Sequence, residues 1–209
     1  MKEVLSKRLM SFSKDKINTF DAMLSEPCGI DDHLCLMANG SPRNLIRLCE
    51  RIFAIQSDRD PSAHKVTMEA IDQATVSHSE QICIESYGEN ILKELQRIGR
   101  ELFTTNFVAN DVLKVSANGA RNKITGWASL GVVAQVGTTI VPPATRPTHL
   151  YGVVDPCAVR VIHRAIPFEE FVRDRWLPCK HCNTDNLINI ELYPEGEDPI
   201  CRQCGRKLL

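Results

Sequence analysis

The sequence lacks the short motifs that mark several common classes of enzyme. It contains no G-x-x-x-x-G-K-[ST] motif and no Gly-Lys pair, so it has no backbone cradle for the phosphates of a nucleotide. It also has no G-x-S-x-G nucleophile elbow and no H-E-x-x-H zinc motif. Its six histidines are widely separated along the chain. We therefore expect no catalysis by this chain alone, and in particular no ATP hydrolysis.

Long apolar runs are missing as well. The longest run without a charged residue, 124–145, contains three glycines and two prolines, which makes it too polar and too interrupted to cross a membrane. The first 16 residues carry scattered charges and no apolar core, unlike a secretory signal. These absences predict a cytoplasmic protein with no membrane partner.

Cysteine, in contrast, is plentiful, with nine residues in the chain of 209. Four of them form two C-x-x-C pairs, Cys179 with Cys182 and Cys201 with Cys204, separated by 18 residues. This spacing is typical of two turns that together hold one tetrahedral zinc ion. The remaining five lie singly and are interpreted as reduced structural thiols: Cys28, Cys35, Cys49, Cys83 and Cys157.

The residues around the two pairs suit tight metal-binding turns. Asn183 follows the first pair and Gly205 the second, and both residue types tolerate the positive φ that such turns need. Between the pairs, residues 186–192 alternate like a strand. His181 lies inside the first turn, and we expect its ring to point outward rather than to bind the metal.

The segment 167–209 that contains the four cysteines is too small to hold a hydrophobic core unaided, so bound metal would supply its folding free energy. Four thiolates close the coordination shell, which predicts a structural rather than a catalytic Zn²⁺. The segment resembles the zinc-ribbon family. Members of that family bind nucleic acid, bind protein or complete a domain, and the resemblance leaves these alternatives open.

The middle segment, 86–166, is the only basic part of the chain. Residues 86–165 carry 9 Lys+Arg against 5 Asp+Glu, whereas the whole chain has a net charge of −1. Its hydrophobic spacing predicts a helix over 87–103 and a short helix over 109–116, with Asn110 as a possible cap. A third helix is predicted to start near residue 117 and to end at Gly131, with Leu130 facing inward. Strands follow over 132–136 and 149–154, joined by a long tip over 138–148.

This order of helices followed by a hairpin resembles a winged-helix domain, a variant of the helix-turn-helix. In that family the third helix enters the major groove of DNA and the wing touches the backbone. The resemblance implies that duplex DNA is a possible partner. The residues that it places at the DNA are Asn118, Arg121, Asn122 and Thr125 on the third helix, Lys123 near its rim, and Arg146 on the wing.

A plainer interpretation of the same segment is also open. Winged helices serve as protein docking modules too, and the excess of positive charge is modest for a protein that binds duplex DNA. Arg121 and Lys123 would then belong to a solvated surface. Gly119 and Gly126 also weaken the predicted third helix, because each costs about 1 kcal/mol relative to alanine.

The N-terminal segment, 1–80, is predicted to be a bundle of helices over 1–12, 30–39, 41–57 and 64–75. Ser41 is a good N-cap and Pro42 a good first residue for the third of these helices. Arg43 follows directly, where a cation faces the positive end of the helix dipole. One stripe of this helix is predicted to face the core, namely Leu45, Leu48, Cys49, Ile52 and Phe53.

The phrase "GSPRNLIRL" at residues 40–48 resembles the sensor-2 region in the helical lid of P-loop ATPases of the AAA+ and related signalling (STAND-like) types. In that family the arginine on the first turn of the lid helix reaches the γ-phosphate of a nucleotide held by the neighbouring core. The resemblance assigns this nucleotide-sensing role to Arg43, with ATP bound only by a separate core. Alternatively, Arg43 pairs with a surface carboxylate such as Asp31 or Asp32.

Together these observations predict a mainly α fold with small β elements: a lid-like helical bundle, a winged helix and a small β zinc ribbon. Two functions are compatible with it. The first is the non-catalytic C-terminal module of a P-loop ATPase, which couples nucleotide state to DNA or partner binding. The second is a stand-alone zinc-containing adaptor between proteins, with no role for nucleotide or DNA.

Overall fold

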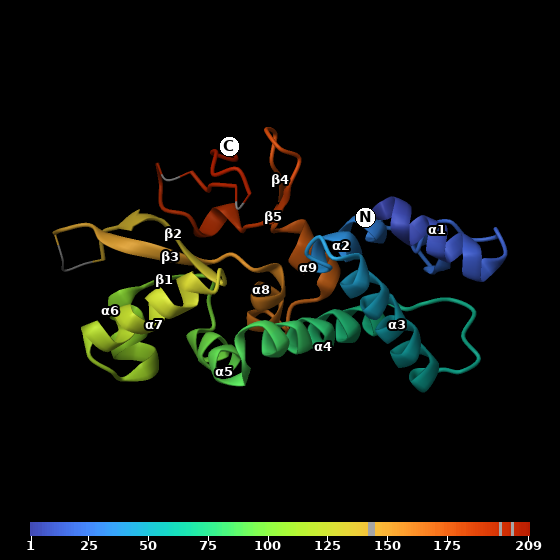
Figure 1. The fold of residues 1–209 in the computed structure, drawn as a ribbon, viewed down its shortest axis with the longest axis horizontal. Coiled ribbons are helices and arrows are strands. Elements are labelled where there is room, and N and C mark those ends of the chain that lie inside the picture. Colours follow the sequence, from blue (N-terminus) through green and yellow to red (C-terminus); the bar gives the residue numbers. More distant parts are fainter. Residues whose placement is uncertain (142–144, 197, 202) are drawn as a thin grey trace.

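The fold, seen in a computed structural model, is mainly helical with two small antiparallel sheets (Figure 1). The structure describes residues 1–141, 145–196, 198–201 and 203–209. The part of the predicted wing tip at residues 142–144 lies outside the described residues. None of the helices in the described ranges combines the length and the apolar character that crossing a bilayer requires.

The first half of the chain forms the predicted helical bundle. Its elements are α1 (Lys2–Ser13), the short 3-10 helix η1 (Asp21–Met23), α2 (Ile30–Met37), α3 (Pro42–Arg59) and α4 (Met68–Tyr87). Helix α3 begins as predicted, because the Ser41 side chain accepts a hydrogen bond from the backbone N–H of Asn44 at 3.3 Å. Four residues of its predicted inner stripe are buried, while Phe53 remains 40% exposed and its ring lies tilted against that of buried Phe20, with the ring centroids 5.4 Å apart.

Helix α4 is longer than the sequence pattern predicts, and it runs through the boundary expected between residues 80 and 86. The chain later returns to this helix. Helices α8 (Pro156–Ile162) and α9 (Phe168–Arg173), which the sequence places in the winged helix and the ribbon, both contact α4. The bundle therefore consists of an N-terminal part and a later part, and the middle segment lies between them in the sequence.

A carboxylate marks the place where the middle segment leaves and rejoins the bundle. Asp155 caps α8 by accepting the N–H of Ala158 at 2.8 Å. Its other oxygen accepts a hydrogen bond from the Tyr87 hydroxyl at 3.1 Å and one from the Asn39 side chain at 3.3 Å. Asp155 thus joins the end of α4, the start of α8 and the loop that precedes α3.

The middle segment contains α5 (Glu89–Ile98), β1 (Leu102–Thr104), α6 (Thr105–Phe107), the π-helical turn η2 (Val108–Leu113), α7 (Ala117–Ser129), β2 (Val133–Thr139) and β3 (Thr148–Val153). The three strands form one antiparallel sheet in the order β1-β3-β2. The third helix and the two strands of the hairpin were predicted, although β2 extends to Thr139 and so includes two residues expected in the tip. Strand β1 was not predicted.

Four details of this segment correct the prediction. The helix expected over 87–103 ends at Ile98, because Gly99 adopts the left-handed conformation with φ 65°. Residues 102–104 then pair with β3 instead of continuing the helix. The next helical segment is capped by Thr104 rather than by Asn110, and Leu130 at the end of α7 is 47% exposed rather than inward.

Candidate metal centre and neighbouring surfaces

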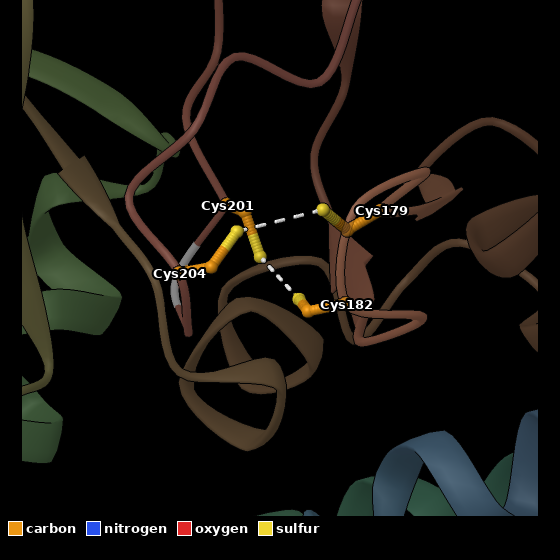
Figure 2. Close-up of side chains that lie close together, drawn as sticks. All are labelled: Cys179, Cys182, Cys201 and Cys204. Carbon is orange, nitrogen blue, oxygen red and sulfur yellow. Dashed lines mark hydrogen bonds between the residues drawn. The ribbon is translucent and has the colours of Figure 1, made fainter.

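The four cysteines of the two C-x-x-C pairs lie together in the C-terminal segment (Figure 2). All four Sγ atoms are within 4.8 Å of one another. The Cys179 and Cys204 sulfurs are 3.7 Å apart, and those of Cys182 and Cys201 are 3.6 Å apart. A tetrahedral zinc with Zn–S bonds of about 2.3 Å would hold its sulfurs roughly 3.8 Å apart. The cluster is therefore positioned to bind a metal ion such as zinc.

Each cysteine pair lies on a turn of the same design. After the first pair, the N–H of Asn183 donates to the Cys179 carbonyl at 2.9 Å, and Asn183 has φ 54°. After the second, the N–H of Gly205 donates to the Cys201 carbonyl at 2.9 Å, and Gly205 has φ 69°. The two turns share this hydrogen bond, and the prediction of positive φ at Asn183 and Gly205 is confirmed.

Backbone N–H groups point at the sulfur atoms, as a thiolate site requires. The N–H of His181 donates to Cys179 Sγ at 3.4 Å, and the N–H of Gln203 donates to Cys201 Sγ at 3.4 Å. Although burial raises the pKa of the Cys201 thiol, the backbone N–H groups of Cys204 and Gln203 and the side chains of Cys182 and Asn186 outweigh it and lower the pKa to about 6. At Cys201 this favours the thiolate form that binds metal.

Sequence reasoning found the four sulfurs but missed Asn186. This residue is 1% exposed, and its side-chain amide donates to the Thr184 carbonyl at 2.9 Å and lies 3.7 Å from Cys201 Sγ. It belongs to β5 (Asp185–Leu187), which pairs with β4 (Trp176–Pro178). The strand predicted over 186–192 is too long, because residues 190–192 form the 3-10 helix η3 (Ile190–Leu192). A single asparagine between Asp185 and Leu187 gives no signal of this role.

The His181 ring lies outside the sulfur cluster, as predicted. The residue is exposed, and its Nδ1 is 3.3 Å from a guanidinium nitrogen of Arg206. Among the described residues, few apolar side chains pack beside the cysteines: Leu208 is buried next to Cys179 and Cys201, with two half-buried neighbours, Leu177 and Ile188. Apolar packing therefore contributes little to the stability of the region around the four sulfur atoms.

A buried ion pair attaches this segment to the rest of the molecule. Arg175, just before β4, donates from Nε to Glu101 Oε1 at 2.6 Å, and Glu101 immediately precedes β1. His163 Nε2 lies 2.9 Å from the same carboxylate oxygen. Burial opposes the charge on Glu101, but His163 and Arg175 outweigh it and lower the pKa of this carboxyl. Three parts of the chain thus meet at one ionised carboxylate.

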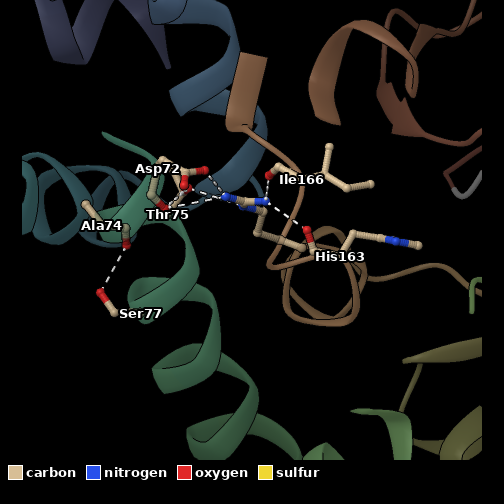
Figure 3. Close-up of polar contacts among 7 residues, drawn as sticks. Asp72, Ala74, Thr75, Ser77, His163 and Ile166 are labelled. Carbon is tan, nitrogen blue, oxygen red and sulfur yellow. Dashed lines mark hydrogen bonds and ion pairs between the residues drawn. The ribbon is translucent and has the colours of Figure 1, made fainter. Parts of the chain in front are cut away.

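Arg160, on α8, occupies a second buried polar site. Figure 3 labels the residues that supply its acceptors, which are Asp72, Thr75, His163 and Ile166. Arg160 is 0% exposed, and its guanidinium donates to the carbonyls of His163 at 3.1 Å and Ile166 at 2.8 Å. It also donates to Thr75 Oγ1 at 3.3 Å and forms an ion pair with Asp72. Since the guanidinium is surrounded by acceptors within the chain, this cluster is structural.

The polar side chains predicted to contact DNA lie mostly on one exposed face of α7. Asn118, Arg121, Asn122 and Thr125 are all exposed, and Arg121 donates to the Asn118 side chain at 2.9 Å. Lys123 differs, because it lies on the flank of α7 that faces α5 and forms an ion pair with Glu94. Arg146, in the loop between β2 and β3, is exposed.

Arg43 is exposed at the N-terminal end of α3, whose first turn contains no acidic residue. Within the described part of the chain it has no ion pair and no side-chain hydrogen bond. The carboxylates considered as its partners have other roles: Asp31 accepts the N–H groups of Phe20 at 2.9 Å and Asp21 at 3.1 Å, and Asp32 pairs with Lys2. The structure does not bring Arg43 together with the cysteine cluster or with the α7 face.

Comparisons with known proteins add no assignment, because no family model, no curated protein and no solved structure matches the chain.

Proposed function

We propose that this chain is a non-catalytic module that binds duplex DNA through α7 and the β2–β3 hairpin, with a zinc ribbon that completes the fold. The observation that carries the proposal is the exposed polar face of α7, where Asn118, Arg121, Asn122 and Thr125 lie together. Arginine and asparagine are the side chains best suited to paired hydrogen bonds with guanine and adenine edges. An amphipathic helix with such a face fits the major groove.

The order of the elements supports the same proposal. Helix α5, strand β1, the helical segment α6–η2, helix α7 and the hairpin β2–β3 follow one another as in a winged helix, and the sheet has the order β1-β3-β2. Strand β1, which was absent from the sequence prediction, adds a third strand to the sheet of the hairpin. In this arrangement the exposed face of α7 serves as the recognition surface and the loop with Arg146 serves as the wing.

Zinc has a structural role in this proposal. The described residues supply a complete set of four thiolates, which leaves no open coordination position for a substrate. The metal joins the two turns and thereby supplies the free energy that orders residues 177–209. The ribbon is in turn attached to the winged-helix unit through Arg175 and Glu101.

The salt dependence of DNA binding tests the proposal. Each phosphate contact that is lost should reduce the slope of log K against log salt concentration by about 0.9. We expect Arg121→Ala and Arg146→Ala to weaken binding, and Arg146→Ala to reduce this slope. Lys123→Ala should have a smaller effect, because Lys123 is already paired with Glu94. Arg59→Ala, at the exposed C-terminal end of α3, is the matched control.

The competing function is a protein adaptor without a DNA role, and the Lys123–Glu94 pair favours it, because it removes one cation from the surface offered to DNA. The same titration separates the two functions. If a protein that retains its metal shows no detectable binding of duplex DNA at low salt, the DNA proposal is wrong and the adaptor function is favoured.

We further propose that the helical bundle acts as the lid of a P-loop ATPase whose core is supplied separately, with Arg43 as the sensor of the nucleotide phosphate. An exposed arginine at the positive end of a helix, without an acidic neighbour in the first turn, is suited to an external anion. The test is the hydrolysis rate of a candidate core reconstituted with this chain. Arg43→Ala should lower that rate while Arg47→Ala, which removes the pair with Glu85, should not. Equal rates for both variants contradict the sensor role.

A further inference from the structure

An apolar groove lies between α1 and α3, at the end of the molecule that is farthest from the β2–β3 hairpin (Figure 1). Its volume is about 630 Å³. Helix α1 forms one wall and α3 the other, with the loop between α1 and η1 at one end. Its lining is almost entirely apolar, and the main contributors are Val4, Leu9, Phe12, Met23, Leu45 and Phe53.

Large apolar side chains remain exposed around this groove. Phe12, on α1, is 81% exposed and is the most exposed large hydrophobic residue described in the chain. Phe53, on α3, is 40% exposed, and Met10 is 37% exposed. Aromatic side chains grouped beside an apolar groove are typical of protein interfaces, since each leaves a large area in water when the surface is free.

Each wall of the groove also carries one charged side chain without a partner. Arg8 lies on the α1 wall and Glu50 on the α3 wall, and both are exposed. Neither has an ion pair or a side-chain hydrogen bond within the described part of the chain. The neighbouring cations on α1 are already paired, Lys2 with Asp32 and Lys7 with Glu3. The groove thus has one unpaired positive charge on the α1 wall and one unpaired negative charge on the α3 wall.

We propose that this groove is the interface of a symmetric homodimer, in which the occupant is a second copy of the chain. A two-fold axis makes every contact occur twice, so a surface that binds itself must carry its own complement. This surface does: Phe12 of each copy enters the groove of the other, and Arg8 of each copy pairs with Glu50 of the other. A partner with a single type of charge would leave one of the two walls without a counter-ion.

The position of the groove is compatible with the rest of the molecule. Since α1 and the β2–β3 hairpin lie at opposite ends (Figure 1), a dimer formed through α1 and α3 leaves both copies of α7 exposed. The inference does not depend on DNA binding, because it rests on the groove, on Phe12 and on the two unpaired charges. Dimerisation and DNA binding can therefore succeed or fail separately.

Sedimentation equilibrium across protein concentrations up to roughly 100 µM tests the proposal. The unmodified chain should form a dimer, and Phe12→Ala should raise the dissociation constant at least about tenfold. Leu130→Ala is the matched control, because Leu130 is 47% exposed at the end of α7, far from the groove, and should leave the constant unchanged. These positions are on the surface, and circular dichroism checks that each variant keeps its helical content.

A charge exchange provides the decisive comparison. Arg8→Glu and Glu50→Arg should each weaken the dimer, because each places like charges opposite one another across the interface. The double variant, Arg8→Glu with Glu50→Arg, should recover most of the affinity, since the charges are again complementary. A monomer throughout this concentration range would overturn the proposal. So would a dimer that responds to neither Phe12→Ala nor the charge exchange.

Discussion

Removal of the metal should unfold the C-terminal segment while the helical bundle remains intact. The expectation follows from the size of the local core, because the buried apolar packing beside the cysteines comes chiefly from Leu208. Full burial of one leucine contributes about 2 kcal/mol. Binding of zinc to a structural site contributes roughly 10–16 kcal/mol at neutral pH. The free energy of zinc binding is several times the free energy gained by burying Leu208. We therefore expect the segment that begins at residue 177 to lose its order when the metal is removed.

Amide hydrogen exchange with and without a chelator provides the assay. In the metal-bound protein the N–H groups of His181, Gln203, Asn183 and Gly205 should be protected, because each donates within a turn. Chelation should expose all four to exchange, and the amides of α4 should keep their protection. Elemental analysis should find one zinc per chain.

Variants at single cysteines complete this test. Cys201→Ser should lose the zinc, whereas Cys28→Ser, at a half-buried thiol outside the cluster, should retain it. Cobalt bound in place of zinc should give the visible absorption of a tetrahedral thiolate site in the Cys28→Ser variant but not in Cys201→Ser. The reasoning is refuted if the metal-free protein keeps the four turn amides protected.

Two further predictions concern the buried bundle. Arg160→Ala should lower the free energy of unfolding by about 3–5 kcal/mol in urea denaturation, because it leaves buried acceptors without a donor; a loss below about 1 kcal/mol would contradict this. Burial, together with nearby Arg51 and Arg47, lowers the pKa of His78 from 6.5 to about 4. The unfolded chain therefore takes up the proton first, and stability present above pH 6.5 is lost as the pH falls toward 4, by roughly 3 kcal/mol. His78→Gln should flatten this dependence in urea titrations at several pH values, and an unchanged slope would show that other groups cause it.

The parts of the structure that local sequence determines were predictable. Each cysteine turn depends only on its own two cysteines and on the residue that follows them, Asn183 or Gly205, so the C-x-x-C spacing is enough to predict a metal site. The start of α3 is equally local, since Ser41 and Pro42 act on the first turn that follows them.

Features that depend on distant partners were not predictable. Strand β1 has only three residues, and it forms because β3, nearly 50 positions later, offers a free edge. Arg160 is charged, so its sequence context suggests exposure, yet it is buried because Asp72 and Thr75 lie opposite it on α4. Asn186 likewise acquires its role only when the second cysteine turn folds beside it.

The hydrogen bond between Tyr87 and Asp155 has a consequence for how the chain is built. It brings the last residue of α4 next to the residue that caps α8, so residues 88–154 leave the bundle and return to it at one place. Such a segment is an insertion into the bundle. Because its two ends meet, the loops of this segment can change in length without altering how α4 and α8 pack, as long as Glu101 and the contacts of α5 with both helices are kept. The segment that we propose binds DNA is thus also one that tolerates such changes.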